Sequence, residues 1–348
     1  MTNLQNQTEI FEGISVSPLP PLTSGGPPSS REGDDSQQKG EAVNGEIIGT
    51  STIFLNDITK IDSALFDPGR GVIGQTWRID VSLTGPLNSN GFVLDFSEFK
   101  KMVRKVLKSS LDHALIIPIN SQSVVFKGAG RGECWVMRSR NGKGGVEQEW
   151  TYVSPPGAVF PSRSIALNRQ VLEQEVVRSL RHRLPPDILH ISATLREDDT
   201  NPTEAVFRYT HGIAHHSGMC QRLFHGHKSR ILCYVGEERR PDYEHYLVRD
   251  ILGSQVHIAT PSQQKSGPLI PTGYRGKTKE AVTLAYEGSQ GYFEATMPAD
   301  RIFMVEHETS IECITRELAK VVKREENTPE KVKIICFEGV DKGSMAEI

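Results

Sequence analysis

Several features that mark other classes of protein are scarce or missing in this chain of 348 residues. It has five cysteines, scattered and odd in number, which predicts reduced thiols and disfavours a disulfide framework. The net charge is −3 without a dense basic stripe, so we expect no nucleic-acid partner. No stretch approaches the roughly twenty apolar residues of a membrane span, and MTNLQNQTE lacks the features of a signal peptide. The sequence therefore predicts a cytoplasmic protein with no membrane partner.

The start of the chain differs in kind from the rest. Residues 1 to about 48 are rich in Pro, Gly, Ser and Glu and contain little that could be buried. We therefore expect residues 1–50 to be a disordered extension without a catalytic role. The remaining chain is long enough for two domains, each with its own hydrophobic core.

The most informative segment is FRYTHGIAHHSGMCQRLFHGH, residues 207–227. His225 and His227 are two residues apart, so they lie on one face of a strand and can converge on one ion. His211 ends the preceding apolar run AVFRYTH, which predicts a neighbouring strand with residues 212–224 as the connecting loop. Three imidazole ligands with a fourth position open are typical of catalytic zinc.

Other interpretations of this segment stay open. An HxH pair also occurs on ordinary surface strands, and the loop contains two further histidines, His215 and His216, beside a predicted turn at Ser217 and Gly218. Cys220 can be a fourth zinc ligand, an inert loop thiol or a base beside the metal, because spacing alone does not separate a ligand from a base. A thiol near a dication is partly ionised at neutral pH, which suits proton transfer.

These motifs together resemble the family of 6-pyruvoyl- and 6-carboxytetrahydropterin synthases. The resemblance rests first on the pattern F, three residues, H, a loop with C, then HGH and the alternating run KSRILCYVG. Residues 85–118 resemble the family's strand, its helix beginning with Asp-Phe, and its Leu-Asp-His motif, here ending in Asp112 and His113. Residues 308–348 resemble its closing helix, strand and pterin-anchoring glutamate.

The order of the motifs does not fit one copy of this family. A single member has its zinc motif before Leu-Asp-His, whereas here Asp112 and His113 come about a hundred residues before His211. We therefore expect two tandem units, residues 51–204 without zinc ligands and residues 205–348 with the zinc site. This alignment places Leu65 at the first histidine, residues 74–76 at HGH, and residues 255–257 at Leu-Asp-His.

The resemblance implies an α+β fold with two tandem tunnelling-fold units. Each unit is expected to have antiparallel strands and a helical layer, with two hairpin strands followed by two more antiparallel strands. Open sheet edges predict that such a protein closes into a ring as a homo-oligomer.

The resemblance also implies a Zn²⁺ cofactor and a small-molecule pterin substrate, 7,8-dihydroneopterin triphosphate. In this interpretation Cys220 moves one proton, while Asp112 orients His113, which exchanges a second proton with the substrate side chain. Asp112 can equally be a structural cap at the end of a helix. The expected activity is that of a lyase forming 6-carboxytetrahydropterin, as in queuosine biosynthesis; the alternatives are a 6-pyruvoyl product or a zinc-containing binding protein without turnover.

Three further residues are implied at the substrate. Glu338 would accept paired N–H hydrogen bonds from the pterin ring, although it can also be a charge at a strand end. Thr309 and Glu312 resemble the substrate-side start of the closing helix, or they form a capping box there. The candidates for binding the triphosphate are the basic residues Arg222, Lys228 and Arg230.

Overall fold

The computed structural model describes residues 49–140, 145–201, 203–253 and 255–348, which all belong to one compact unit. The expected disordered extension, residues 1–50, therefore lies almost wholly outside the described residues. The α-helices are α2 (Phe96–Ser109), α3 (Arg169–Arg181), α4 (Pro241–Tyr246) and α5 (Ile311–Glu326), and a π-helix, Leu247–Leu252, continues α4. Among the helices in the described residues, none is long and apolar enough to span a membrane.

The first sheet contains the long hairpin β1 (Thr50–Asp67) and β2 (Gly71–Pro86) at its centre. Its other strands are β3 (Leu115–Pro118), β7 (Val159–Ser162) and β8 (His190–Arg196). The strand order is β7-β3-β1-β2-β8. The β1–β2 and β2–β8 pairs are antiparallel, whereas the β1–β3 and β3–β7 pairs are parallel.

The second sheet repeats this order of connections. Its strands are β9 (Ala205–His211), β10 (His225–Val235), β12 (Gln255–Ala259), β16 (Ile302–Met304), β17 (Val332–Phe337) and β18 (Gly343–Glu347). The strand order is β16-β12-β9-β10-β17-β18, with the short β11 (Glu238–Arg239) paired to β10. The β9–β10 and β10–β17 pairs are antiparallel, and β12 is parallel to both β9 and β16.

The expectation of purely antiparallel sheets was wrong in both cases. After each hairpin the chain passes through a helix before it adds its next strand. Such a crossover connection returns the new strand parallel to the first one. The α+β character is nevertheless as expected, with the helices gathered on sheet faces.

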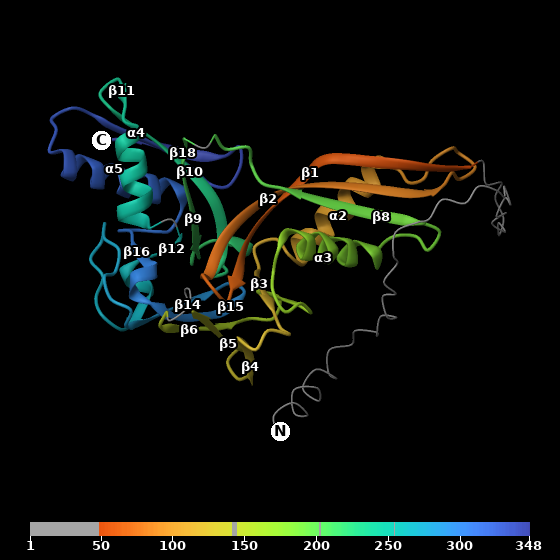
Figure 1. Ribbon diagram of the computed structural model, residues 1–348, viewed down its shortest axis with the longest axis horizontal. Helices are drawn as coiled ribbons and strands as arrows, with labels where there is room; N and C mark the ends of the chain where they lie inside the picture. The colour runs from red at the N-terminus through yellow and green to blue at the C-terminus, as the bar shows by residue number, and fades with distance from the viewer. Residues whose placement is uncertain (1–48, 141–144, 202, 254) are drawn as a thin grey trace. The chain divides into compact units, whose positions relative to one another are not determined.

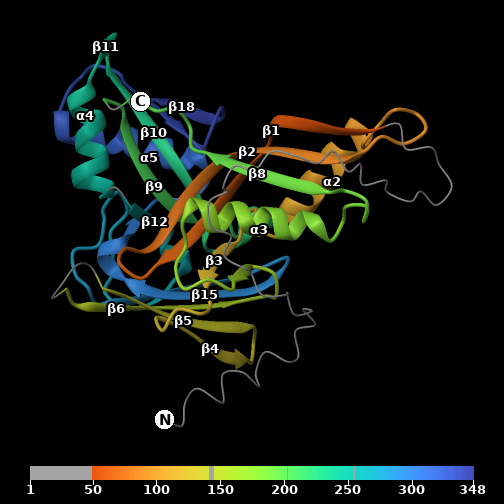
Figure 2. The same ribbon diagram turned by 45° about the vertical axis from the view of Figure 1, so that its right-hand side comes forward.

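Helices cover each sheet because each has one apolar face. Asp95 caps α2 by accepting hydrogen bonds from the backbone N–H groups of Ser97 and Glu98. Helices α2 and α3 lie on the same face of the β1–β2–β8 sheet (Figures 1 and 2), where their apolar residues share a core with that sheet. Helix α5 packs its apolar face on β9, β10 and β17 in a second core.

A third sheet joins two insertions that are far apart in the sequence. It contains β4 (Val124–Ala129), β5 (Glu133–Arg140), β6 (Glu147–Ser154), β13 (Gln264–Ser266), β14 (Ala281–Gly288) and β15 (Gly291–Pro298). The strand order is β13-β14-β15-β6-β5-β4, so β15 and β6 form the junction between the insertions. Figure 2 shows β5, β6 and β15 side by side.

The register of the two hairpins corrects the sequence alignment by one residue. Ala64 of β1 faces Gly74 and also pairs with β3, just as Thr210 of β9 faces Gly226 and also pairs with β12. Gly74 thus takes the place of Gly226, so that residues 73–75, and not 74–76, stand at HGH. Leu115, which pairs with Ala64, likewise matches His257, which pairs with Thr210, and this moves the counterpart of Leu-Asp-His by two residues, from 255–257 to 253–255. A shift of one residue matters because it moves every side chain to the other face of the strand.

Candidate metal centre and active site

Three buried histidines meet at the end of the β9–β10 hairpin. His211 lies opposite His225 in the antiparallel register, and His227 follows two residues later on the same face. One nitrogen of each ring lies within 4.8 Å of the others. The predicted pair of strands with a connecting loop at 212–224 is confirmed by this register.

The free nitrogens of this cluster fit a metal ion. The carbonyl oxygen of Thr309 lies 2.6 Å from His211 Nδ1, while His211 Nε2 and both nitrogens of His225 have no hydrogen-bond partner among the described residues. Burial lowers the pKa of His211 to about 3 and that of His225 well below its usual value, so both rings are neutral. Neutral imidazole nitrogens without partners are costly to bury, and they are the ligands that zinc prefers.

An aspartate from the other hairpin supports the third histidine. Asp62 Oδ1, on β1, lies 3.1 Å from His227 Nδ1, and the Thr76 hydroxyl donates to the same oxygen at 2.6 Å. Burial alone would raise the pKa of Asp62, but His227 and Lys342 hold this pKa well below its usual range. A carboxylate behind a ligating histidine fixes the tautomer and orientation of the ring. Asp62 could not be predicted from the sequence, because the contact arises only when the two hairpins pack together.

The Asp112–His113 pair reaches the cluster from the turn after α2. Asp112 Oδ2 lies 2.9 Å from His113 Nδ1, and Asp112 Oδ1 accepts a hydrogen bond from the Asp62 N–H at 3.0 Å. His113 has a positive φ of 58°, and its N–H donates to the Asp62 carbonyl at 2.7 Å. A non-glycine residue in this region costs about 1–3 kcal/mol, a strain that is concentrated at functional sites.

Cys220 completes a second group of potential ligand atoms beside the first. It lies in a short 3₁₀ turn, Met219–Gln221, and its sulfur is within 4.8 Å of nitrogens of His113 and His225. The His113 ring stacks on His225 with 4.3 Å between ring centroids. Burial lowers the pKa of His113, but hydrogen bonds to Asp112 and Cys220 outweigh it and raise this pKa to about 10. The thiol is therefore placed to exchange protons with His113 as well as to face the metal ligands.

The structure places Glu338 next to the cluster. Glu338 directly follows β17, and its Oε1 lies 3.8 Å from His227 Nε2. Its other oxygen, Oε2, lies 2.9 Å from Lys342 Nζ. One carboxylate oxygen thus faces the histidines while a lysine holds the other.

Thr309 and Glu312 lie at the start of α5, where the sequence left two interpretations open. Thr309 is buried, and its hydroxyl donates to the Gly212 carbonyl at 3.0 Å, so its polar groups position His211 and the start of the loop. The predicted capping box is wrong, because the N-cap of α5 is Ser310, whose side chain accepts from the Cys313 N–H. Glu312 is exposed in the first turn of α5, and within the described part of the chain it makes no hydrogen bond with the cluster.

The three basic residues that are candidates for binding the triphosphate have different partners in the structure. Lys228 forms an ion pair with Glu197 at 2.6 Å, and Arg230 forms one with Glu204 at 2.9 Å. Arg222 is 8% exposed; its Nε donates to Gln290 at 3.3 Å, and its Nη1 has no partner among the described residues. Of the three, Arg222 has a buried N–H donor that no described residue accepts.

Comparison with known proteins gives one family match. Residues 68–126 match the family model for 6-pyruvoyl tetrahydropterin synthase, a segment that includes Asp112 and His113. A search of curated proteins found no match.

Solved structures of 6-pyruvoyl tetrahydropterin synthases are similar in part. The enzyme from Plasmodium falciparum is 18% identical, with 44% of this chain and 94% of that chain covered and a TM-score of 0.35. The enzyme from Plasmodium vivax is 17% identical with the same coverage and TM-score. The segment of this chain that matches the tetrahydropterin synthase model is thus the one that delivers Asp112 and His113 to the three histidines.

Proposed function

We propose that this chain is a zinc-dependent lyase of the tetrahydropterin synthase type. It acts on 7,8-dihydroneopterin triphosphate and forms 6-carboxy-5,6,7,8-tetrahydropterin, as in the queuosine (7-deazaguanine) pathway. The observation that carries the proposal is the meeting, within one chain, of the histidine cluster with Cys220 and the Asp112–His113 pair.

The chain is proposed to contain two tandem units, residues 51–204 and 205–348. Two observations support this division. The order β7-β3-β1-β2-β8 is matched by β16-β12-β9-β10-β17, with the same parallel and antiparallel pairs. Each unit also inserts three strands at the same point, and the two insertions pair through β6 and β15. The first unit then supplies Asp112 and His113, and the second supplies the histidines and Cys220.

His211, His225 and His227 would hold the zinc ion. When bound, zinc acidifies substrate oxygens and stabilises negative charge that develops on them. Asp62 and the Thr309 carbonyl orient two of the rings through their other nitrogens.

Proton transfer falls to Cys220 and His113. Because Asp112 contacts His113 Nδ1, the opposite nitrogen of that ring is the one free to exchange a proton with the thiol or the substrate. A pure binding protein would need neither a strained histidine nor a partly buried carboxylate behind it, so this arrangement favours an enzyme.

Substrate recognition is assigned to two charged groups. The Glu338 oxygen that faces the cluster can accept N–H groups from the pterin ring. Arg222 has a buried N–H without a partner in the described part of the chain and can donate it to an anionic side chain of the substrate. Thr309 and Glu312, at the start of α5, are also proposed to lie at the substrate, as the family resemblance implies.

The second candidate is a 6-pyruvoyl product, which the family model matched by residues 68–126 favours. Both reactions use the same substrate and differ in the bonds broken in its side chain. Incubating the pure protein with dihydroneopterin triphosphate and identifying the product by mass separates them. Absence of any tetrahydropterin product from zinc-loaded protein would contradict an enzymatic role.

We also propose a ring-shaped homo-oligomer. Strands β8 and β18 are the last strands of their sheets in the described part of the chain, and an edge of this kind can pair with another copy. A monomer by light scattering would contradict the ring.

A further inference from the structure

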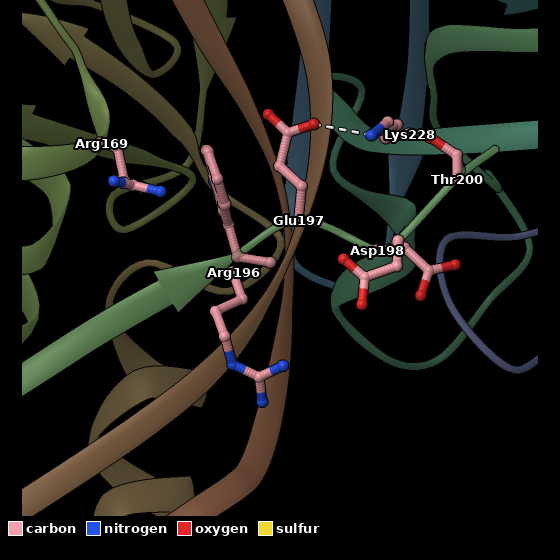
Figure 3. A pocket seen from close by; sticks show the side chains of 8 residues that line it. Arg169, Arg196, Glu197, Asp198, Thr200 and Lys228 are labelled. Carbon is pink, nitrogen blue, oxygen red and sulfur yellow. Dashed lines mark hydrogen bonds and ion pairs between the residues drawn. The ribbon is translucent and has the colours of Figure 1, made fainter. Parts of the chain in front are cut away.

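A cavity lies on the β1–β2 hairpin, and none of the three clustered histidines lines it. Its volume is about 260 Å³, and its walls include Leu65 and Ile73 of the hairpin, Leu167 before α3, and Arg208 of β9. A wider hollow of about 680 Å³ adjoins it and shares Trp77, Arg169 and Glu197 (Figure 3). Together they offer the space of an ordinary small-molecule site, roughly 300–1,000 Å³.

This cavity occupies the place in the first sheet that the histidine cluster occupies in the second. Counted from the paired glycines, Leu65 faces Ile73 across the first hairpin at the position where His211 faces His225 across the other. Gln75 follows Ile73 as His227 follows His225. The side chains at the three ligand positions are therefore leucine, isoleucine and glutamine.

A glutamate stands at the matching position in both sites. Arg196, the last residue of β8, faces Arg78, and Glu197 follows it directly. Glu338 follows the last residue of β17 in the same way, and the register of β17 on β10 places it at the same height on its hairpin.

The two carboxylates are held alike. Glu197 Oε2 accepts from Lys228 Nζ at 2.6 Å and from Arg208 Nη2 at 3.3 Å, while Oε1 makes no hydrogen bond with the described residues. Figure 3 shows the lysine contact on one oxygen and the other oxygen turned away from it. At the histidine cluster, Lys342 Nζ contacts Glu338 Oε2 in the same manner. An open carboxylate oxygen beside apolar walls suits adjacent N–H donors of a flat heterocycle.

Three arginines line this cavity together with the carboxylates of Asp67 and Glu197, and the adjoining hollow adds Arg196, Lys228, Asp198 and Asp199. Arg70 and Arg169 line it with more than half of each side chain exposed, and Arg208 lies deeper. Arg70 forms an ion pair with Asp67 at 3.1 Å, whereas Arg169 forms a longer one with Glu173 at 3.8 Å. Guanidinium groups placed in this way favour a ligand with an anionic group.

The cavity lacks the metal ligands and the thiol that the proposed reaction uses. Leucine and isoleucine offer no metal ligand at two of the three positions. The turn between β1 and β2 is only residues 68–70 and contains no cysteine. At the histidine cluster, the corresponding loop of residues 212–224 carries Cys220.

We infer that this cavity, the Glu197 pocket, is a metal-free binding site for a 2-amino-4-oxo nitrogen heterocycle with an anionic side chain. The choice of heterocycle rests on the proposed function, because Glu197 and Glu338 stand in matching places. The pocket holds its ligand without turnover, so each chain binds two such molecules.

Calorimetric titration of the full-length protein with neopterin triphosphate tests this inference. The wild-type chain should bind two equivalents, Glu197→Gln should bind one, and Glu338→Gln should also bind one. Leu167→Trp, which fills the pocket without touching the carboxylate, should match Glu197→Gln and serves if that variant does not fold. Turnover of dihydroneopterin triphosphate is measured on the same preparations, because it reports on the proposed active site at the histidine cluster.

The possible results separate the two proposals. One equivalent of ligand that persists in Glu197→Gln and Leu167→Trp but disappears in Glu338→Gln overturns the Glu197 pocket and leaves the proposed function intact. Binding that Glu197→Gln removes, in a protein that shows no turnover, supports the pocket and contradicts the proposed function. No binding at all to folded protein overturns the pocket.

Discussion

Gly74 of β2 and Gly226 of β10 face each other where the two hairpins cross. A Cβ atom added to Gly226 would lie 2.7 Å from Gly74 Cα, and one added to Gly74 would lie 1.9 Å from the Tyr209 carbonyl oxygen. Neither glycine has a positive φ, so what excludes a side chain is the close approach of backbones and not conformation. This contact brings Asp62 within reach of His227 and Asp112 within reach of the cluster.

Gly74→Ala should therefore destabilise the fold and weaken the metal site together. Backbone atoms must move to admit the methyl group, and overpacking of this kind costs typically about 1–3 kcal/mol. Thermal unfolding and zinc content measure the two effects. Gly130→Ala is the matched control, because a Cβ there meets nothing within 4 Å; equal stability of the two variants would contradict the role of the crossing.

The local part of the site could be predicted from the sequence, while the part made by the crossing could not. The spacing of His225 and His227 and the apolar run ending in His211 are enough to specify a hairpin that gathers three imidazoles. Asp62 carries no such pattern, because it meets His227 only through contact between two hairpins that are distant in the chain. The junction of β6 with β15 was missed for the same reason.

The protein should carry one tightly held zinc ion per chain, because a single set of three histidines meets the geometry in the described residues. His225→Ala or His227→Ala should release it, as measured by elemental analysis after dialysis. His215→Ala is the control, since that side chain is 94% exposed and pairs with Glu308. Two tightly held equivalents, or full retention in a variant lacking both His225 and His227, would contradict the assignment.

Asp62→Asn should lower zinc affinity without preventing folding. The substitution keeps the size of the side chain but removes the charge behind His227, and loss of such a partner typically weakens metal binding about 10–100-fold. Competition with a chelator gives the affinity. Asp57→Asn, on the same strand and paired to Arg78 at 2.6 Å, should bind zinc as the wild type does. Unchanged affinity in Asp62→Asn would remove Asp62 from the site.

Cys220→Ala should lose turnover while it retains zinc, because the thiol lies with His113 and the three histidines form their own group. Loss of zinc would instead identify the thiol as a ligand. Cys134→Ala, in the third sheet, is the control. Mixing inactive Cys220→Ala protein with inactive His113→Ala protein should restore no activity, because both residues of each site come from one chain; substantial recovery would show that sites form between chains.

The register error of one residue in the first hairpin has a physical origin. Residues 72–76 are Val-Ile-Gly-Gln-Thr, which contains no histidine to mark the ligand positions, so the sequence alone allowed either alignment. The paired glycines decide between them, and they are recognisable only from the close approach of the two backbones.

The most direct test of the shared site is the turnover of His113→Ala. If Asp112 and His113 act on a substrate held at the zinc of the second unit, turnover of dihydroneopterin triphosphate should fall about a hundredfold or more, the usual scale for loss of a proton-transfer group. Zinc content and thermal stability should stay close to those of the wild type. Wild-type turnover by zinc-loaded His113→Ala protein would contradict the account and leave the first unit as a structural partner.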